Sequence, residues 1–304
     1  MRAELGRLLT AMITPFKADG SVNYDAAQRL AKLLTEQGSD GVVVFGTTGE
    51  APALNDDEKI QLVEAVKEAI PGKTVMAGSG TNNTHHSVEL TRRAVAAGAD
   101  AILAVVPYYN KPAQEGMYLH FREIAAAAGG KPVVMYNIQG RTGINMTAAT
   151  TIRCAEIPGV VGVKEASGSI DQMGFVCAGK PDGFHVWSGD DSFTLPLMAV
   201  GGHGVICVVS HLAGPAMRTL IEAQLEGRND VARDIHLRLL PVINALMTVA
   251  ANPIPVKSVM NELGFPAGPF RLPMTPLPAA ELDRLMEVIK DAGELISFAP
   301  ANVV

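Results

Sequence analysis

Lys164 is the residue of this chain whose position most favours covalent chemistry. It follows the apolar run Pro158–Val163, whereas the other ten lysines fall in helical, loop or turn contexts. An amine among valines is poorly hydrated, which favours its neutral form, and the neutral amine is the nucleophile. A structural lysine paired with Glu165 or another acid is the alternative, and the local sequence does not separate the two.

Polar and aromatic residues also follow four other apolar runs, where a purely structural fold needs only turn residues. These segments are Gly46–Glu50, Pro107–Asn110, Tyr136–Asn137 and Gly189–Asp191. Taken alone, each signal is weak, and a residue such as Tyr136 is more often a core tyrosine whose hydroxyl binds a carbonyl. Together they supply hydroxyl groups and phenols near one amine. Imine chemistry requires such groups because carbinolamine formation and dehydration both need proton delivery.

Eight short apolar runs are the elements that must position these groups. They are Leu8–Phe16, Gly41–Phe45, Thr74–Ala77, Ala101–Val106, Pro132–Tyr136, Val160–Val163, His185–Trp187 and Gly204–Val209. Continuous apolar runs without alternation are typical of parallel strands that are covered on both faces. Each run therefore predicts a strand, and Lys164 falls at the carboxyl end of the sixth.

The segments between these runs carry helix signals. Asn55 with Glu58 predicts a capping box. Thr84 and Thr147 are expected to be N-caps, and Gly38 and Gly98 follow helices where a left-handed C-cap residue would stand. About eight strand–helix units at a regular repeat predict a (β/α)8 TIM barrel, whose active site is built at the carboxyl ends of its strands. An open doubly wound sheet would need a Gly-rich phosphate turn after its first strand, and the sequence has none there.

The strand signal stops near residue 228, so the prediction is a barrel with the active site over residues 1–227 and a helical C-terminal region over 228–304. Two helices are expected there, Val231–Ala251 and Ala279–Phe298, joined by the Pro-rich segment Asn252–Leu277. The tail Ala299–Val304 is expected to be loose.

Composition excludes several classes of protein. The 304 residues are 48% hydrophobic and 18% charged, with a dispersed net charge of −6, which predicts a large core and no nucleic-acid or anionic-membrane partner. The N-terminal segment is too polar for a secretory signal, and no apolar stretch is long enough for a membrane span. Three scattered cysteines (Cys154, Cys177 and Cys207) suggest a reducing compartment, so a cytoplasmic protein is expected.

Signals for a cofactor or a metal are weak. Gly78–Gly80 lacks the third glycine of a dinucleotide fingerprint, and Gly41–Thr48 lacks the lysine of a phosphate-binding loop. His185, His203 and His211 lie near the last two strands, without an acidic or cysteine partner at ligand spacing. We therefore expect no cofactor and no metal.

Six blocks of the sequence carry a resemblance to a known family. They are Gly46-Thr-Thr-Gly-Glu50, Tyr108-Tyr109, Tyr136-Asn137 with Arg141-Thr142-Gly143, Gly162-Val-Lys-Glu-Ala166, Gly201-Gly-His-Gly-Val-Ile206 and Asn252-Pro-Ile-Pro-Val-Lys257. In order and spacing, they are similar to the signature blocks of the dihydrodipicolinate synthase / N-acetylneuraminate lyase family. The resemblance runs from about Leu8 to Leu277. Thr47, Arg141 and the last block favour the synthase branch.

This resemblance implies roles for the residues that do the chemistry. Lys164 would form a Schiff base with pyruvate, and Tyr136 would shuttle protons beside it. Thr48 would link Tyr136 to Tyr109, a tyrosine that in this family reaches in from a neighbouring subunit.

The resemblance also implies how the substrates are held and what is made. Arg141 would hold the carboxylate of aspartate semialdehyde, while Thr47 and the backbones of Gly189 and Ile206 would frame pyruvate. The implied product is 4-hydroxy-tetrahydrodipicolinate, in lysine and diaminopimelate biosynthesis. The implied assembly is a homotetramer built as a dimer of dimers.

One departure from the family's pattern lies inside the site. The family commonly has Pro and then Ser or Gly between the asparagine of the tyrosine block and the arginine, where this chain has Ile138-Gln139-Gly140. The aldehyde partner therefore stays open. The alternative is another pyruvate-dependent class I aldolase of the same family, acting on 2-keto-3-deoxy sugar acids or N-acetylneuraminate.

A second departure concerns regulation. In inhibited relatives, lysine binds at a subunit interface, through a serine, two histidines and a glutamate. The matching positions here are Ala51, Asp56, Lys59 and His86, so none of the four is kept. The resemblance thus implies weak or absent inhibition by lysine.

Overall fold

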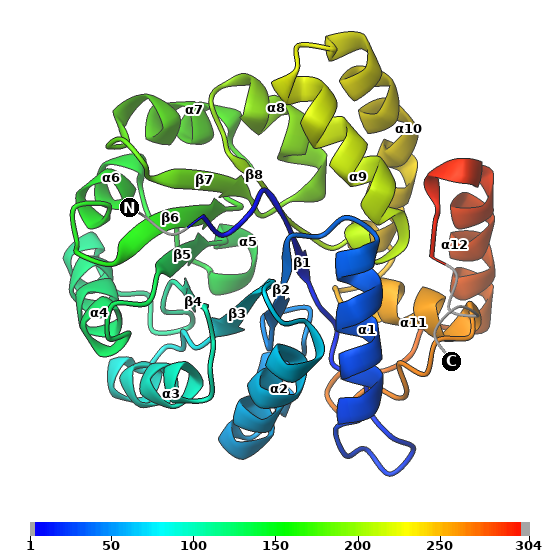
Figure 1. The fold of residues 1–304 in the computed structure, drawn as a ribbon, viewed down its shortest axis with the longest axis horizontal. Helices are drawn as coiled ribbons and strands as arrows, with labels where there is room; N and C mark the ends of the chain where they lie inside the picture. The colour runs from blue at the N-terminus through cyan, green and yellow to red at the C-terminus, as the bar shows by residue number, and fades with distance from the viewer. Residues whose placement is uncertain (1–3, 299–304) are drawn as a thin grey trace.

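The computed structural model describes residues 4–298, and its centre is a closed barrel of eight parallel strands in sequence order (Figure 1). The strands are β1 (Leu8–Ala11), β2 (Gly41–Val44), β3 (Thr74–Gly78), β4 (Ala101–Val105), β5 (Val133–Asn137), β6 (Val160–Glu165), β7 (His185–Ser188) and β8 (Gly204–Cys207). β1 pairs with both β2 and β8, which closes the barrel. Each strand lies inside or within two residues of the run that predicted it, so the predicted TIM barrel is confirmed.

Burial on both faces explains why these runs are apolar. Side chains such as Leu9, Met76 and Trp187 fill the inside of the barrel, in a cluster with Ile206 and Tyr136. The outward-facing side chains pack against the surrounding helices in a second, larger cluster. Water therefore reaches neither face of most strands, which favours Val, Ile and Leu at successive positions.

The helices between the strands surround the barrel. They are α1 (Tyr24–Glu36), α2 (Asp56–Ala69), α3 (Thr84–Ala96), α4 (Gln114–Ala127), α5 (Gln139–Thr142), α6 (Ala148–Cys154), α7 (Ile170–Gly179), α8 (Thr194–Ala199) and α9 (Ser210–Leu225). Three 3-10 turns accompany them, η1 (Ala51–Ala53), η2 (Asp191–Phe193) and η3 (Gly293–Leu295).

Most of the predicted helix ends are confirmed. Asn55 and Glu58 form both hydrogen bonds of the capping box, at 2.9 and 3.0 Å. Thr147 caps α6, and both expected C-terminal glycines have positive φ. The prediction for Thr84 is wrong by one residue. The side chain of Asn83 accepts the bond from His86 N, so Thr84 is the first helical residue.

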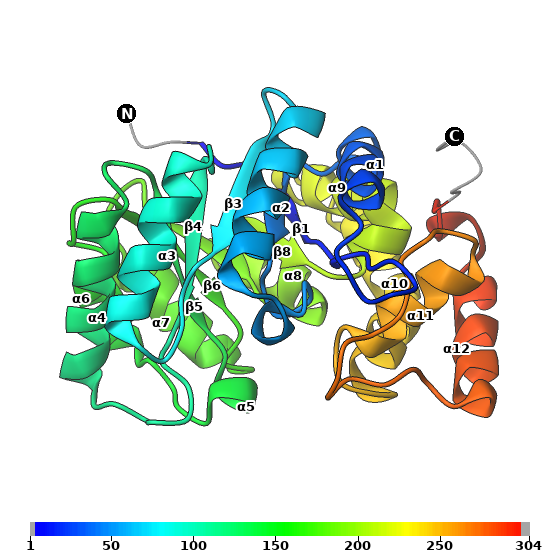
Figure 2. The same cartoon turned by 90° about the horizontal axis from the view of Figure 1, so that it is seen from below.

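The C-terminal region packs against one side of the barrel through α9 (Figures 1 and 2). It contains α10 (Asn229–Thr248), α11 (Ile254–Glu262) and α12 (Ala279–Asp291). α11 corrects the prediction, which had a joining segment there. Its prolines fall in the first turn, where a missing N–H needs no partner, so they do not prevent a helix. The predicted loose tail, Ala299–Val304, lies outside the described residues.

A buried ion pair ties this region to the loop after β2. Lys257 Nζ, on α11, donates to Glu50 Oε1 at 2.7 Å and to the carbonyl of Thr14 at 3.0 Å. Arg271 binds both carboxylate oxygens of Glu58 at the start of α2. The C-terminal region thus supports the loop that carries Thr47 and Thr48. Across residues 4–298, no helix is long and apolar enough to cross a membrane.

Candidate active site

Lys164 and Tyr136 stand side by side at the carboxyl ends of β6 and β5. They are partners in the strand register, and each is only 5% exposed. Lys164 Nζ lies 4.4 Å from the centre of the Tyr136 ring. The predicted position of Lys164 at the carboxyl end of the sixth strand is confirmed. Within residues 4–298, Lys164 forms no hydrogen bond and no ion pair, so the alternative of a structural lysine paired with Glu165 is wrong. The Glu165 carboxylate instead accepts hydrogen bonds from Asn137 and from Ser167 N.

Burial decides the protonation of Lys164. Loss of hydration lowers its pKa to about 8, while the carboxylate of Asp191 acts in the opposite direction. At pH 7, roughly a tenth of a lysine with this pKa is in the neutral form. For a solvent-exposed lysine, the neutral fraction is less than about a thousandth. The site therefore supplies a nucleophile near neutral pH.

Tyr136 is held as a protonated phenol. Burial raises its pKa to about 12, although the nearby Arg141 and a hydrogen bond with the Thr47 side chain oppose the shift. A phenol that stays protonated can donate a proton to an oxygen leaving the carbon attached to Lys164, and then take one back.

The role of Thr48 as a link between Tyr136 and Tyr109 stays a prediction. Within this chain, the hydroxyl of Thr48 accepts a hydrogen bond from Asn252 Nδ2 at 2.9 Å, and the neighbouring Thr47 is the threonine whose side chain lowers the pKa of Tyr136. Both follow a backbone turn: Phe45, directly after β2, has a φ of +38°. The chain turns there, so the alternation of a strand no longer tells which threonine faces the barrel.

Arg141 lies on the short helix α5, beyond the end of β5. Figure 2 shows α5 at one end of the barrel. The guanidinium is exposed, and its Nη2 donates to the carbonyl of Asn252 at 3.1 Å. Its charge affects the pKa values of both Tyr136 and Lys164, so it faces the same site.

Gly189, directly after β7, borders Lys164, and Ile206 lies one strand further on, in β8. Gly189 N donates to the carbonyl of Glu165 at 2.8 Å, and a Cβ at Gly189 would lie 3.0 Å from Lys164 Cγ. Only glycine leaves room for the lysine side chain there. Ile206, in β8, is fully buried on the inner face of the barrel.

Tyr109 is not brought to the other residues within this chain. Its side chain is 87% exposed, and its φ is +70°, an uncommon conformation for a tyrosine. No hydrogen bond or ring contact within residues 4–298 joins it to Tyr136.

Sequence reasoning missed two residues of this site. Asp191 is 2% exposed, and its carboxylate accepts hydrogen bonds from the N–H groups of Val208 and Val209. Burial raises its pKa to about 6. Asn252 connects Thr48 with Arg141 from the C-terminal region. Both belong to blocks that the sequence singled out, but no pattern along the chain indicates what they contact.

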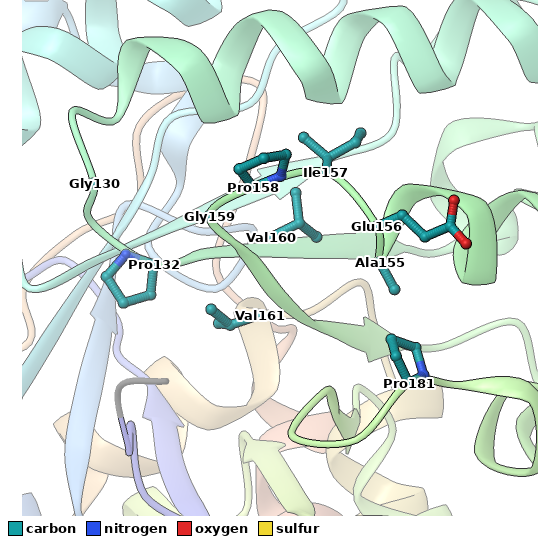
Figure 3. A pocket seen from close by; sticks show the side chains of 10 residues that line it. All are labelled: Gly130, Pro132, Ala155, Glu156, Ile157, Pro158, Gly159, Val160, Val161 and Pro181. Atoms are coloured by element: carbon teal, nitrogen blue, oxygen red, sulfur yellow. The ribbon is translucent and has the colours of Figure 1, made fainter. Parts of the chain in front are cut away.

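Other features lie apart from this site. An open pocket of about 450 Å³ is bordered by the amino end of β6, including Gly159 and Val160, and by Pro132 before β5 (Figure 3). This is the end of β6 opposite to Lys164. Both ring nitrogens of His211 contact backbone groups, and within residues 4–298 no three His, Cys, Asp or Glu residues are placed to hold a metal ion.

Known proteins resemble this chain over nearly its whole length. A model of the Dihydrodipicolinate synthetase family matches residues 4–292. The 4-hydroxy-tetrahydrodipicolinate synthase of Moorella thermoacetica is 50% identical, over 95% of this chain and 99% of its own. The enzyme of that name from Thermosynechococcus vestitus is 48% identical, over 97% and 99%. A structure of DHDPS from Cyanidioschyzon merolae with lysine bound superposes with a TM-score of 0.93 at 44% identity, over 95% of this chain and 98% of that one.

Proposed function

This chain belongs to the Dihydrodipicolinate synthetase family, and we propose that it condenses pyruvate with L-aspartate 4-semialdehyde to give 4-hydroxy-tetrahydrodipicolinate. This reaction is a step of diaminopimelate and lysine biosynthesis. The observation that carries the proposal is the buried Lys164, which has no hydrogen-bond or ion-pair partner within residues 4–298, beside the protonated phenol of Tyr136. A lysine in this state is equipped for Schiff-base chemistry without a metal.

The first half of the reaction activates pyruvate. The neutral amine of Lys164 attacks the keto carbon, and Tyr136 moves a proton to the carbinolamine oxygen, which leaves as water. Loss of a proton from the methyl carbon of the resulting iminium gives an enamine. We assign the hydrogen-bonded pair of Tyr136 and Thr47 to these proton transfers, with Thr48 supporting the loop through Asn252.

The second half forms the new carbon–carbon bond. The enamine carbon attacks the aldehyde, and the aldehyde oxygen takes up a proton. The amino group of the former semialdehyde then attacks the iminium carbon, closes the ring and releases Lys164. Arg141 binds the carboxylate of the semialdehyde, because a guanidinium offers a two-point contact to a carboxylate. The backbone of Gly189, which borders Lys164, and that of Ile206, on the inner face of the barrel, hold pyruvate together with Thr47.

We also propose a homotetramer built as a dimer of dimers, in which Tyr109 of one subunit completes the proton relay of another. The exposure of this tyrosine and its positive φ support an intersubunit role. We assign residues 1–227 to the barrel with the active site and 228–304 to a C-terminal helical region. Because Cys154, Cys177 and Cys207 are all free thiols, we place the enzyme in the cytoplasm.

The test combines trapping with a panel of aldehydes. Pyruvate and borohydride should attach one reduced pyruvyl group per chain, and peptide mapping should find it on Lys164. Among aldehydes offered with pyruvate, aspartate semialdehyde should give the highest kcat/KM. Faster turnover of a sugar-derived aldehyde or of N-acetylmannosamine would instead make the chain an aldolase of the same family, an alternative that the altered segment Ile138–Gly140 before Arg141 keeps open.

A further inference from the structure

Arg141 lies in a segment whose two ends are joined by the side chain of Asn137. Asn137 is the last residue of β5 and is fully buried. Its Oδ1 accepts a hydrogen bond from Met146 N, nine positions further along the chain, at 2.9 Å. Its Nδ2 donates to Asn145 Oδ1 at 2.8 Å and to the carbonyl of Met146 at 3.3 Å. Whatever holds Asn137 therefore also places the segment that carries Arg141.

The segment has little stiffness of its own. Its regular structure is the single helical turn α5, with Gly140 inside it and Gly143 at its end. Glycine gives the backbone wide conformational freedom, and no proline between positions 138 and 145 restricts it. The side chain of Arg141 is exposed and has one hydrogen-bond partner within residues 4–298, the carbonyl of Asn252. The direction of the guanidinium thus depends on the base of the segment.

Glu165, at the end of β6, holds Asn137 in place. Both of its carboxylate oxygens accept from Asn137 Nδ2, each at 3.2 Å. Oε1 also accepts from Ser167 N at 2.7 Å, and Oε2 accepts from Gln172 Nε2 at 3.2 Å. All three partners are neutral donors, and an ionised carboxylate offers acceptors only. Glu165 is fully buried, so these hydrogen bonds are what satisfies its oxygens.

We propose that Glu165, acting through Asn137, is the residue that positions Arg141 for the aldehyde substrate. This inference rests on the proposed function, in which the guanidinium binds the carboxylate of the semialdehyde. Successive side chains of a strand point to opposite faces, so the neighbours Lys164 and Glu165 lie on opposite faces of β6. The inner face of the strand presents the nucleophile, and the outer face fixes the arginine. One strand thereby sets the distance between the two substrates, on which the rate of carbon–carbon bond formation depends.

Glu165→Gln tests this role because it keeps the shape of the side chain and changes one acceptor into a donor. Whichever oxygen becomes the amide nitrogen, it meets the N–H group of a present partner, so the network cannot re-form. We expect kcat/KM for aspartate semialdehyde to fall by about 10- to 100-fold, mainly through KM, because the arginine is misplaced. The KM for pyruvate and the borohydride trapping on Lys164 should stay within about threefold. Equal losses for both substrates would mean general damage to the site and would overturn the proposal.

A double-mutant cycle shows whether Glu165 acts through the arginine. In the Arg141→Ala background, Glu165→Gln should lower kcat/KM for aspartate semialdehyde by less than about threefold further, because the group that it positions is gone. If the loss in this background is as large as in the wild type, Glu165 acts by another route and the proposal fails.

Thr91→Val is the matched control for the loss of a buried hydrogen bond. The hydroxyl of Thr91, on α3, bonds to Ser79 after β3 at 2.7 Å, outside the segment that carries Arg141. This variant also keeps the shape of the side chain, and both KM values should stay within about twofold of wild type. A rise in the KM for aspartate semialdehyde as large as that of Glu165→Gln would show that any such loss has this effect, and would overturn the proposal.

Asn145→Ala gives a second measurement should Glu165→Gln fail to trap pyruvate. Asn145 is half-buried, and its removal takes one acceptor from Asn137 at the far end of the segment. The KM for aspartate semialdehyde should rise by about 3- to 10-fold, the effect expected for one hydrogen bond, with the KM for pyruvate unchanged. An unchanged KM for the semialdehyde would refute the positioning role alone. Wild-type enzyme that traps pyruvate but does not turn over aspartate semialdehyde would refute the proposed function, and this inference with it.

Discussion

Two buried lysines of this protein show how the same burial can serve opposite purposes. Lys164 is 5% exposed and Lys257 is fully buried, and loss of hydration lowers the pKa of each to about 8. Lys257 has what a buried cation needs: the carboxylate of Glu50 at 2.7 Å, the carbonyl of Thr14 at 3.0 Å and the face of Phe16. Lys164 lies against the face of Tyr136 and, within residues 4–298, forms no hydrogen bond and no ion pair.

The difference teaches that the partner, and not the pKa, decides what a buried lysine does. The protonated form of Lys257 is stabilised because its ammonium donates hydrogen bonds to Glu50 and to the carbonyl of Thr14. This lysine therefore ties α11 to the loop after β2. The amine of Lys164 is free to lose its proton and to attack a carbonyl carbon. Substitutions at the two positions should therefore fail in different ways.

The largest expected effect follows from removing the nucleophile. Lys164→Met should lower turnover by about 10³-fold or more and abolish trapping of pyruvate by borohydride, because the amine that attacks the keto carbon is gone. Lys257→Met should keep the trapped label in the folded fraction. A label that persists in Lys164→Met would move the Schiff base to another lysine.

The pH dependence of trapping in wild-type enzyme sharpens the same contrast. Below the pKa of about 8, the free-amine fraction of Lys164 rises about tenfold per pH unit, and above it the fraction levels off. The rate of imine formation, measured by quenching with borohydride, should follow this curve. A rate that levels off only above pH 10 would mean that Lys164 is hydrated like a surface lysine.

Substitution of Tyr136 should give the next largest loss of turnover, because its ring and hydroxyl lie beside Lys164. Tyr136→Phe keeps the ring over the amine but removes the hydroxyl that exchanges protons. We expect kcat to fall by about 10²- to 10⁴-fold, with a much smaller change in the KM for pyruvate. Steady-state kinetics measure both. A variant within about threefold of wild type would make Tyr136 a structural tyrosine.

At the second lysine the effect should appear in stability instead. Lys257→Met leaves the carboxylate of Glu50 buried without its partner, which costs about 3 to 5 kcal/mol of unfolding free energy. Urea titration measures it. The double variant Lys257→Met with Glu50→Gln should recover most of the loss, since no unpaired charge remains. If the single variant is as stable as wild type, the pair does not hold the C-terminal region in place.

The two lysines also mark what the sequence could and could not predict. The strands and Lys164 were predictable because a continuous apolar run is a local pattern, and a lysine at its end contradicts that pattern visibly. Lys257 was part of a recognisable block, but its helix was missed because the surrounding prolines indicated a loop. Its partner Glu50 is about two hundred residues away, and no local pattern reports such a contact.

The arrangement of the site has the same origin. Thr47 and Thr48 are adjacent and follow the backbone turn at Phe45, so no local pattern tells which one faces Tyr136. The contacts of Asn252 with Thr48 and Arg141 join three segments that only the folded chain brings together. Sequence patterns gave the residue types of the site, and the fold decided which of them meet.

A third lysine, Lys59, is 7% exposed and belongs to a half-exposed cluster, where we expect the smallest effect. Its amine lies 3.2 Å from Asp56 Oδ1, and the other oxygen of that carboxylate is 2.8 Å from His86 Nε2. Burial would raise the pKa of Asp56, but hydrogen bonds from His86 and Lys59 outweigh it and hold the pKa below its usual value. The one carboxylate of this cluster is therefore already engaged with two basic groups.

The resemblance to the family implies that Lys59, Asp56 and His86 stand at positions where inhibited relatives bind lysine. An incoming lysine would bring its own ammonium to a place where His86 offers no negative charge and Lys59 repels it. An ammonium left without its partner loses about two orders of magnitude in affinity. We therefore expect 1 mM lysine to change the initial rate by less than about twofold, with pyruvate near its KM.

His86→Glu restores an anion at this position and should bring inhibition back. Strong inhibition of the wild type at sub-millimolar lysine would show that other residues bind the effector, and that the Asp56 carboxylate leaves its two partners to do so.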